Sequence, residues 1–335
     1  MDTTTFDGAL PYLEALGSPP EWAATLLLYT GVIALLTLVY KLFNHVTFYL
    51  LPAMSLDKYR RGDKSWALVT GGSAGIGLAT AQELAARGFD IIILGHLPQE
   101  LEEAARLIQA HAPGTEVKII VLDAVTATPE QIEEALAETL TLPLTILVNN
   151  VAVSPVTFPG IRNLAEYTAA DLDRQIFANA RFMAHVSRIL LPNLAVYGPS
   201  LVLNLSSAAK MGVPGIAPYA GCKAFILSLT KAMAREMWAT NQPVDCLTVV
   251  PGDVKTPSNH IGLQPGYPDA NQFAKAMLDR APRAVARGWH DFHPWWSHSA
   301  TFHLVDLLPR AILEQSLLAT FEKKRQLVLK AHKQI

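Results

Sequence analysis

Cysteine is almost absent from this sequence of 335 residues. Its two cysteines, Cys222 and Cys246, lie far apart and show no metal-binding spacing. Two such thiols form neither a disulfide framework nor a zinc site, so we expect both to be reduced and structural. Four histidines between residues 290 and 303 are spaced by three, five and five residues, which matches no standard ligand set. The sequence therefore predicts no metal site.

Charge of either sign is also scarce. Only 17% of the residues are charged, and the mean hydropathy of +0.23 is high for a soluble enzyme. The 27 Lys and Arg residues nearly balance 29 Asp and Glu residues, and they form no long basic run. We therefore predict no nucleic-acid partner, and we expect membrane lipid to be one partner of the chain.

One apolar run is long enough to reach across a bilayer. It extends for 18 residues from Ala23 to Tyr40, close to the length that spans a hydrocarbon core as a helix. Residues 1–22 carry four acidic side chains and no basic one, which argues against a secretory signal peptide. We predict an uncleaved transmembrane anchor at 23–43. A helix lying in the membrane surface and a buried core helix are the alternatives.

Basic residues that follow this run predict its orientation. By the positive-inside rule they place the bulk of the chain in the cytosol and residues 1–22 outside it or in a lumen. We expect 44–63 to be a linker and 64–335 to be one domain, with a substrate lid from about residue 258. The basic residues are Lys41, Lys58, Arg60, Arg61 and Lys64.

Beyond residue 64, short apolar runs alternate with longer amphipathic segments. This alternation predicts the α/β class, with a Rossmann-type doubly wound parallel sheet in a single domain. Thr128, Pro129 and Gln131 predict a capped helix start. We also expect one long helix at 172–191 and another from Tyr219 to about 238. The expected strands are 66–69, 91–94, 117–122, 144–148, 201–205 and 245–250.

Three motifs fall at the carboxyl ends of these strands, where α/β sheets bind ligands. The first is the glycine-rich turn from Thr70 to Gly77, between a strand and a helix, which suits a pyrophosphate. The second is the pair Ser206 and Ser207. The third is Tyr219 with Lys223, whose spacing puts a phenol and an ammonium on one helical face. A nearby cation should lower the pKa of the phenol. A surface pair on a helix is the alternative.

In this order, the motifs resemble the short-chain dehydrogenase/reductase family over about residues 64–260. Thr70 to Gly77 matches T-G-x-x-x-G-x-G, and Asn149-Asn150-Val151-Ala152 resembles N-N-A-G with Val-Ala in place of Ala-Gly. Tyr219-x-x-x-Lys223 and the run from Pro251 to Thr256 complete the set. This resemblance implies an enzyme that acts on C=O or CH–OH groups with a nicotinamide cofactor.

The resemblance also implies roles for four catalytic residues. Tyr219 would be the general acid, and Lys223 would tune it. Ser207 would orient the carbonyl group, although the usual loop length would make Ser206 the acting serine instead. Asn179 would hold a proton-relay water, and an ordinary polar helix residue is its alternative.

The resemblance further implies a set of cofactor contacts. No carboxylate follows the second strand. His96 occupies the place of the arginine found in related NADP enzymes, which favours NADP over NAD. Asp123 would meet the adenine, with a turn cap as its alternative. The expected cofactor-binding residues are Gly71, Ser73, Ala74, Gly75, Ile76, Gly77, His96, Asp123, Asn150, Tyr219, Lys223, Pro251, Gly252, Val254 and Thr256.

An apolar anchor before this fold resembles the microsomal branch of very-long-chain 3-oxoacyl-CoA reductases and 17β-hydroxysteroid dehydrogenases. We therefore expect a lipophilic substrate, a long-chain 3-oxoacyl-CoA first, and residence in the endoplasmic reticulum membrane. A steroid, retinoid or specialised-metabolite ketone is the alternative, and a catalytically idle scaffold or cofactor sensor is another. Related enzymes often pair through the helices of Asn179 and Tyr219, so a homodimer is a further expectation. We expect the late aromatic residues to form either a membrane-facing lid over the substrate or part of the core. They are Trp289, Phe292, Trp295, Trp296 and Phe302.

Overall fold

The computed structural model describes residues 20–62, 64–153, 158, 160–260, 263 and 266–332, without the side chains of 306, 331 and 332. The chain separates into two compact units, Met1–Pro52 and Ala53–Ile335. Most of the predicted non-cytosolic segment 1–22 lies outside the described residues. So do parts of the expected substrate-pocket walls, at 154–157, 159, 261–262 and 264–265.

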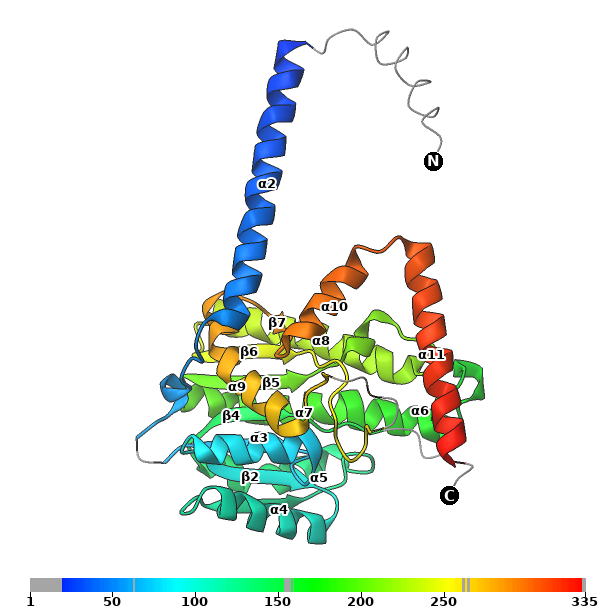
Figure 1. Cartoon of the computed structure of the whole chain (residues 1–335). Coiled ribbons are helices and arrows are strands. Elements are labelled where there is room, and N and C mark those ends of the chain that lie inside the picture. Colours follow the sequence, from blue (N-terminus) through cyan, green and yellow to red (C-terminus); the bar gives the residue numbers. More distant parts are fainter. Residues whose placement is uncertain are drawn as a thin grey trace. The chain divides into compact units, whose positions relative to one another are not determined.

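The described part of the N-terminal unit, residues 20–52, contains one long helix, α2 (Glu21–Leu50). Its 30 residues correspond to about 45 Å at 1.5 Å per residue. Its most apolar stretch has a mean hydropathy of 2.0, so its length and composition allow it to cross a membrane. The helix is longer than the predicted 23–43 segment because the less apolar residues on both sides continue it (Figure 1).

The second unit is built on a sheet of seven parallel strands in the order β3-β2-β1-β4-β5-β6-β7. This confirms the predicted Rossmann-type class. All six expected strands are present within two residues of their expected bounds, and the short seventh strand was not expected. The strands are β1 (Trp66–Thr70), β2 (Asp90–Gly95), β3 (Val117–Val121), β4 (Leu144–Asn149), β5 (Ser200–Leu205), β6 (Val244–Val249) and β7 (Asp291–Phe292).

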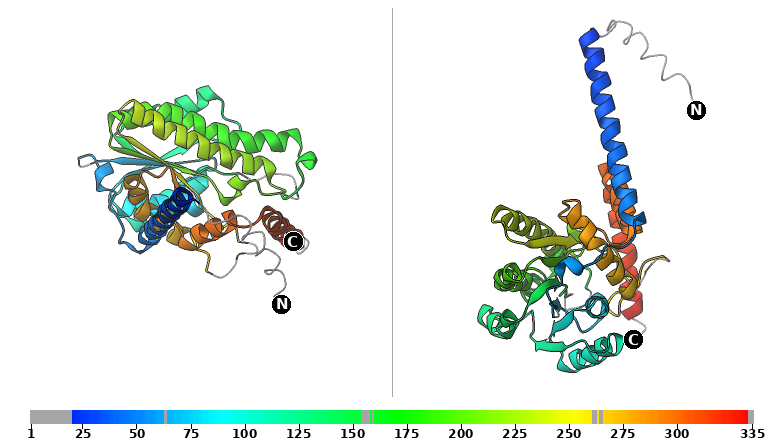
Figure 2. Two further views of the ribbon diagram at one scale, coloured as in Figure 1. Left: turned by 90° about the horizontal axis from the view of Figure 1, so that it is seen from above. Right: turned by 90° about the vertical axis from the view of Figure 1, so that its left-hand side faces the viewer.

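Helices cover both faces of this sheet (Figure 2). Packing joins α3 to α4 and α9 on one face, and α5 to α7 and α6 to α8 on the other. Every residue of β1, β4 and β5 is buried, as two covered faces require. The helices are α3 (Gly75–Ala86), α4 (Pro98–His111), α5 (Pro129–Leu136), α6 (Ala169–Ile176), α7 (Phe182–Val196), α8 (Ala217–Ala239), α9 (Ala270–Ala286), α10 (Trp296–Asp306) and α11 (Arg310–His332). Short helical turns occupy Asp57–Tyr59, Glu138–Thr141, Leu164–Glu166 and Ala208–Met211.

Local signals predicted some of these helices well and one of them incompletely. The capping box at α5 is present, since Thr128 and Gln131 bond each other's backbone. The helix expected at 172–191 is longer, and it is interrupted by a π-turn, η5 (Phe177–Arg181), between α6 and α7. Asn179 lies within that turn.

The segment just before β1 is part of the catalytic unit. The Met54 N–H donates to the carbonyl of Asp279 in α9 at 3.1 Å. Leu56 and Tyr59 are buried, and the Tyr59 hydroxyl donates to the Asp245 carboxylate at 2.8 Å. Residues 54–59 of the expected linker are therefore fixed to the second unit, which leaves three residues between Met54 and the end of α2.

Candidate active site

The turn between β1 and α3 forms a cradle made of backbone. Gly71 and Gly75 have φ angles of +64° and +56°, a region that favours glycine. A Cβ on Gly77 would lie 2.0 Å from the Gly71 carbonyl oxygen and 2.6 Å from Nδ2 of Asn150, so only glycine fits there. The N-terminus of α3 therefore approaches the turn closely, in the geometry that binds phosphate groups.

Asn150 fixes this cradle to the neighbouring strand. Its side-chain amide donates to the carbonyls of Thr70 and Gly71, both at 3.1 Å. Its own N–H donates to the Thr70 hydroxyl at 3.0 Å. Asn149 points away from the cradle into the core, where its amide donates to Asn204 at 2.8 Å. Asn150 is therefore the member of the pair that shapes the expected cofactor site.

The structure brings Tyr219, Ser207 and Lys223 together beside the end of β5. The Ser207 side chain lies close enough to the Tyr219 phenol to lower its pKa. The Lys223 ammonium lies 5.3 Å from the centre of the Tyr219 ring and donates to the Leu205 carbonyl at 2.9 Å. Ser206 instead points inward, and its hydroxyl donates to the Lys223 carbonyl at 2.7 Å. This geometry favours Ser207 over Ser206 as the serine that faces a substrate.

Burial is the main cause of the pKa shifts of Tyr219 and Lys223. Burial raises the pKa of the Tyr219 phenol, and the nearby Ser207 side chain opposes that rise. The sequence predicted the opposite direction, because the depth of burial is not visible in a motif. Burial also lowers the pKa of Lys223 to about 8. The site thus holds a neutral phenol next to an amine that titrates close to physiological pH.

Asn179 joins the π-turn to the loop that follows β4. Its Oδ1 accepts from the Val153 N–H at 3.2 Å, and its amide donates to the carbonyls of Val153 and Gln175, both at 3.0 Å. Asn179 is 1% exposed. Both amide hydrogens of Asn179 are therefore used in hydrogen bonds to backbone carbonyls. A bound water would have to donate to carbonyl oxygen atoms of this region instead. π-turns of this kind often occur at functional sites.

The loop after β6 closes the site from the other side. The carbonyl of Pro251 accepts the Ala208 N–H at 2.8 Å, which joins this loop to the one that carries Ser207. A Cβ on Gly75 would lie 3.5 Å from Thr256, so Thr256 faces the glycine-rich turn. Val254 is buried. The expected cofactor residues of this loop therefore lie beside the cradle.

Sequence reasoning missed one support of this loop, His298 in α10. The Gly252 N–H donates to Nδ1 of His298 at 3.1 Å, and Nε2 lies 3.1 Å from the Asp253 carbonyl. His298 is therefore neutral with its proton on Nε2, and burial lowers its pKa. The spacing of the four late histidines gave no signal for this role. Within the described residues, no three His, Cys, Asp or Glu side chains gather as metal ligands.

A hollow lies at the carboxyl ends of β2 and β3. It measures about 450 Å³, and both His96 and Asp123 line it. The Asp123 carboxylate accepts from the Val125 N–H at 2.9 Å, so this residue also caps a turn. The Ser73 hydroxyl donates to Glu100 at 3.3 Å, which brings a carboxylate close to the cradle. The residues that line this hollow follow β2 and β3, at the strand ends where the adenosine of the cofactor is expected.

The C-terminal helix α11 crosses the open edge of the site. The Phe321 ring occupies the space beside Gly215, where an added Cβ would lie 1.8 Å from it. Lys324 donates to the Asp253 carboxylate at 3.1 Å. The Gly215 carbonyl also accepts the Arg162 N–H at 2.9 Å. The last described helix thus contacts the loop before Tyr219 and the loop after β6, as no local pattern could indicate.

The aromatic residues expected to form a lid divide between core and surface. Phe292 in β7 is 2% exposed and packs in the core, whereas Trp296 at the start of α10 is 62% exposed. The Phe302 ring stacks on His293 with centroids 4.7 Å apart. Core packing therefore holds for Phe292, and a membrane-facing lid stays a prediction for the exposed Trp296.

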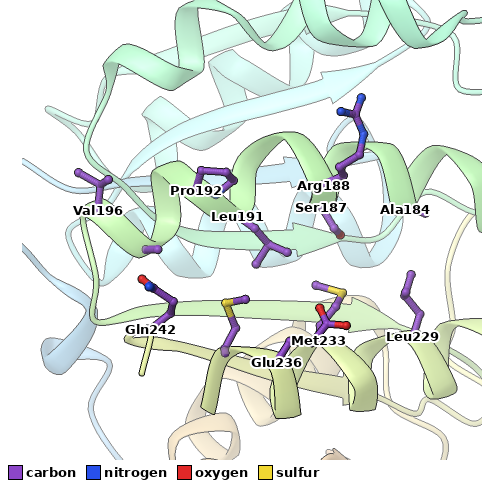
Figure 3. Close-up of a pocket in the computed structure, with 12 residues that line it drawn as sticks. Ala184, Ser187, Arg188, Leu191, Pro192, Val196, Leu229, Met233, Glu236 and Gln242 are labelled. Carbon is purple, nitrogen blue, oxygen red and sulfur yellow. The ribbon is translucent and has the colours of Figure 1, made fainter. Parts of the chain in front are cut away.

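A groove of about 620 Å³ between α7 and α8 lies apart from these residues (Figure 3). Apolar side chains from both helices face it, among them Leu191, Leu229, Met233 and Met237. It contains none of the expected catalytic or cofactor-binding residues. This groove is therefore a candidate contact surface rather than the site of the chemistry.

A sheet edge that offers a phosphate cradle and a buried proton donor suits a nucleotide-dependent oxidoreductase. Comparison with known proteins gives the family. The family model described as short chain dehydrogenase matches residues 65–262, so the chain belongs to the short-chain dehydrogenase family and is an oxidoreductase. Enzymes of this family use NAD or NADP.

Two characterised relatives are similar over much of the chain. A very-long-chain 3-oxoacyl-CoA reductase from Mycosarcoma maydis is 31% identical over 340 residues, covering 93% of this chain and 92% of that protein. A 17-beta-hydroxysteroid dehydrogenase type 3 from Danio rerio is 32% identical over 197 residues, covering 57% of this chain and 61% of that protein. The predicted branch of the family is thereby confirmed.

Solved structures share the fold at lower identity. A short chain dehydrogenase from Pseudomonas syringae has a TM-score of 0.64 and 22% identity, covering 73% of this chain and all of that one. A relative from Burkholderia phymatum in complex with NAD has a TM-score of 0.62 and 20% identity, covering 73% and 93% of the two chains. One from Sphingobium yanoikuyae in complex with NADPH has a TM-score of 0.58 and 21% identity, covering 74% and 97%. Both cofactors therefore occur on this fold.

Proposed function

We propose that this chain is a membrane-anchored, NADP-dependent reductase of a lipophilic ketone, with a long-chain 3-oxoacyl-CoA as its substrate. The observation that carries the proposal is the Tyr219 phenol next to Ser207 and the buried Lys223 at the end of β5. A scaffold would have no use for a buried lysine without a carboxylate, because burying such a group costs stability.

Each of these residues has a role that follows from its position. Tyr219 donates its proton to the oxygen of the reduced carbonyl, and the raised phenol pKa keeps that proton available at neutral pH. Ser207 donates a hydrogen bond to the same oxygen and orients it. Lys223 uses one N–H on the Leu205 carbonyl and has two left for the ribose of the cofactor and for water. NADPH, when bound, supplies the hydride.

Asn179 then acts mainly by fixing backbone. It holds the π-turn against the loop after β4, so that carbonyl oxygen atoms of this region retain a relay water. Substituting Asn179 should therefore slow proton resupply to Tyr219 and leave cofactor binding intact.

The cradle fits a dinucleotide because Gly77 leaves room for a pyrophosphate at the N-terminus of α3. The contacts expected from Gly71, Ser73, Ala74, Gly75 and Ile76 belong to this turn. His96, which lines the hollow at the ends of β2 and β3, supports NADP, since an imidazole N–H can donate a hydrogen bond to a 2′-phosphate. Glu100 beside Ser73 opposes that pairing, so NADH should also bind, more weakly.

The relative from Mycosarcoma maydis supports the acyl-CoA substrate, because its similarity covers 93% of this chain. The relative named as a steroid dehydrogenase covers a smaller share and supports a steroid ketone as the second candidate. By the same comparison with the reductases we propose single-pass insertion through α2 in the endoplasmic reticulum membrane, with the catalytic unit in the cytosol.

We also propose a homodimer in which a second copy covers the groove between α7 and α8. Val196 and Trp238, near the ends of these helices, are 71% and 83% exposed in the single chain. Large exposed apolar side chains beside an apolar groove suit a protein contact. Leu229→Glu should convert a dimer into a monomer in detergent by light scattering, and an unchanged mass would contradict this contact.

The function is tested by NADPH oxidation in detergent, with NADH in parallel, against long-chain 3-oxoacyl-CoAs and steroid ketones. Tyr219→Phe should lose nearly all turnover while retaining cofactor affinity, and Tyr197→Phe is the matched control. Ser207→Ala should also lose turnover, and Ser206→Ala should instead lower stability. Wild-type turnover by Tyr219→Phe would refute the assigned acid. Cofactor binding without turnover of any ketone would favour the scaffold or sensor.

A further inference from the structure

The hairpin of α10 and α11 ends in an exposed apolar tip, residues 304–312. Leu304, Leu307 and Ile312 are 63%, 81% and 50% exposed, and all three lie within nine residues. Figure 1 shows this turn projecting beyond the sheet and its flanking helices. Clustered apolar exposure of this kind marks an interaction surface rather than ordinary surface variation.

The charges near this tip are compatible with a lipid headgroup region. The Arg310 side chain is 92% exposed, and its guanidinium lies 3.8 Å from Glu314 in the next turn of α11. A long arginine side chain can bury its methylene groups among lipids and keep its charge in water. Apolar residues with a flanking arginine therefore suit the boundary between headgroups and acyl chains.

The connection to α2 brings the catalytic unit to that boundary. Helix α2 ends at Leu50, and Met54 is already hydrogen-bonded to Asp279 of α9. Four residue steps reach at most about 14 Å. The chain thus enters the catalytic unit against α9, the helix that β7 and α10 follow in the sequence.

We infer that the apolar tip inserts into the face of the bilayer that holds α2, and so gives the catalytic unit a second membrane contact. This inference rests on the membrane anchor proposed above. It assigns the tip to lipid, because the tether keeps a bilayer within reach of the catalytic unit at all times.

The same helix links the tip to the active site. From Arg310 to Lys324, α11 runs 14 residues, or roughly 21 Å at 1.5 Å per residue. At its far end it contacts Gly215 and the Asp253 carboxylate. Insertion of the tip therefore fixes how the open edge of the site faces the bilayer from which a lipophilic substrate arrives.

Site-directed labelling of the full-length protein tests this inference. Both native cysteines are buried, so an introduced cysteine can be labelled selectively with an environment-sensitive fluorophore. The protein is reconstituted in phosphatidylcholine vesicles with and without nitroxide-labelled phosphatidylcholine. The variants are Leu307→Cys at the tip, Leu36→Cys in the middle of α2, and Leu107→Cys on α4, which Figure 1 shows at the opposite end of the unit.

We expect the label at position 307 to shift its emission to the blue and to be quenched by the nitroxide lipid, whereas the label at position 107 stays in water. If the label at 307 behaves like the one at 107 while the label at 36 is quenched, the tip does not insert, and the membrane anchor at α2 is still supported. A label at 36 that remains in water overturns the anchor. Quenching at 307 alone would support the tip as a contact that needs no spanning helix.

A kinetic variant gives an independent readout. Leu307→Asp should raise the KM for a ketone dissolved in the vesicles and leave kcat and NADPH affinity unchanged. Leu107→Asp, the matched control, should change neither constant. An unchanged KM for Leu307→Asp would contradict the inference.

Discussion

The cradle at Gly77 allows a prediction whose size follows from the structure. In Gly77→Ala, the new Cβ would lie 2.0 Å from the Gly71 carbonyl oxygen, whereas ordinary contacts begin at 3.4 Å. The turn and the first residues of α3 must therefore separate by about 1.4 Å. Because the nearest atom belongs to backbone, no side-chain rotation can relieve this contact.

A displacement of that size moves the N–H groups of the helix end out of hydrogen-bond range of a bound phosphate. Losing one hydrogen bond to a charged group costs about 1.5–3 kcal/mol. The dissociation constant for NADPH should therefore rise roughly 10- to 100-fold. Overpacking should lower stability by about 1–3 kcal/mol, offset in part by the helix preference of alanine.

Fluorescence titration with NADPH and urea unfolding measure the two effects. Gly221→Ala is the matched control, since Gly221 lies in α8 between Tyr219 and Lys223 and a Cβ there meets nothing within 4 Å. The control should bind cofactor normally and unfold at an equal or slightly higher urea concentration. Wild-type NADPH affinity in Gly77→Ala would refute the assignment of this turn to the pyrophosphate.

Three further predictions concern single buried groups. Arg162→Met should lower the free energy of unfolding by up to about 3–5 kcal/mol, because Arg162 is 5% exposed and the buried Asp171 carboxylate, 2.7 Å from it, would lose this ion pair and keep only weaker contacts such as the Thr168 hydroxyl. Arg188→Met, at an exposed ion pair, should cost at most about 1 kcal/mol, and equal losses in urea would contradict this account. Between pH 8 and 10.5, the unfolded chain keeps the Lys223 proton that the folded protein has lost, so wild-type stability should rise with pH by about 3 kcal/mol relative to Lys223→Met. Parallel stability curves for these two proteins would show that burial does not shift the lysine pKa. His298→Ala removes the acceptor of the Gly252 N–H and should weaken NADPH binding several-fold, whereas His298→Asn, which keeps an acceptor, should recover part of it. An equal effect of both variants on NADPH binding would argue that the ring acts only by filling space.

Much of the fold was predictable because it depends on local patterns. The strands are continuous apolar runs, and the capping box at Thr128 satisfies backbone groups only three residues away. The glycine-rich turn could be assigned for the same reason, since its φ angles and close contacts exclude side chains at fixed positions.

The unpredicted features all depend on contacts between distant residues. The π-turn at Asn179 is held by Val153, 26 residues earlier in the chain. The contact of Phe321 with Gly215 joins segments more than a hundred residues apart and leaves no mark in either segment alone. The predicted direction of the Tyr219 pKa shift was wrong, because burial, the dominant cause of the shift, is a property of the assembled site.

The short connection between Leu50 and Met54 has a kinetic consequence for a membrane-anchored enzyme. With α2 in the membrane as proposed, a catalytic unit held this close to a bilayer would meet its substrate in two dimensions, so the relevant concentration would be the mole fraction of ketone among the lipids. Diluting the vesicles with buffer should then leave turnover per enzyme almost unchanged. Adding inert phospholipid to the same vesicles should slow turnover in proportion to the added surface, as if the substrate had been diluted in solution.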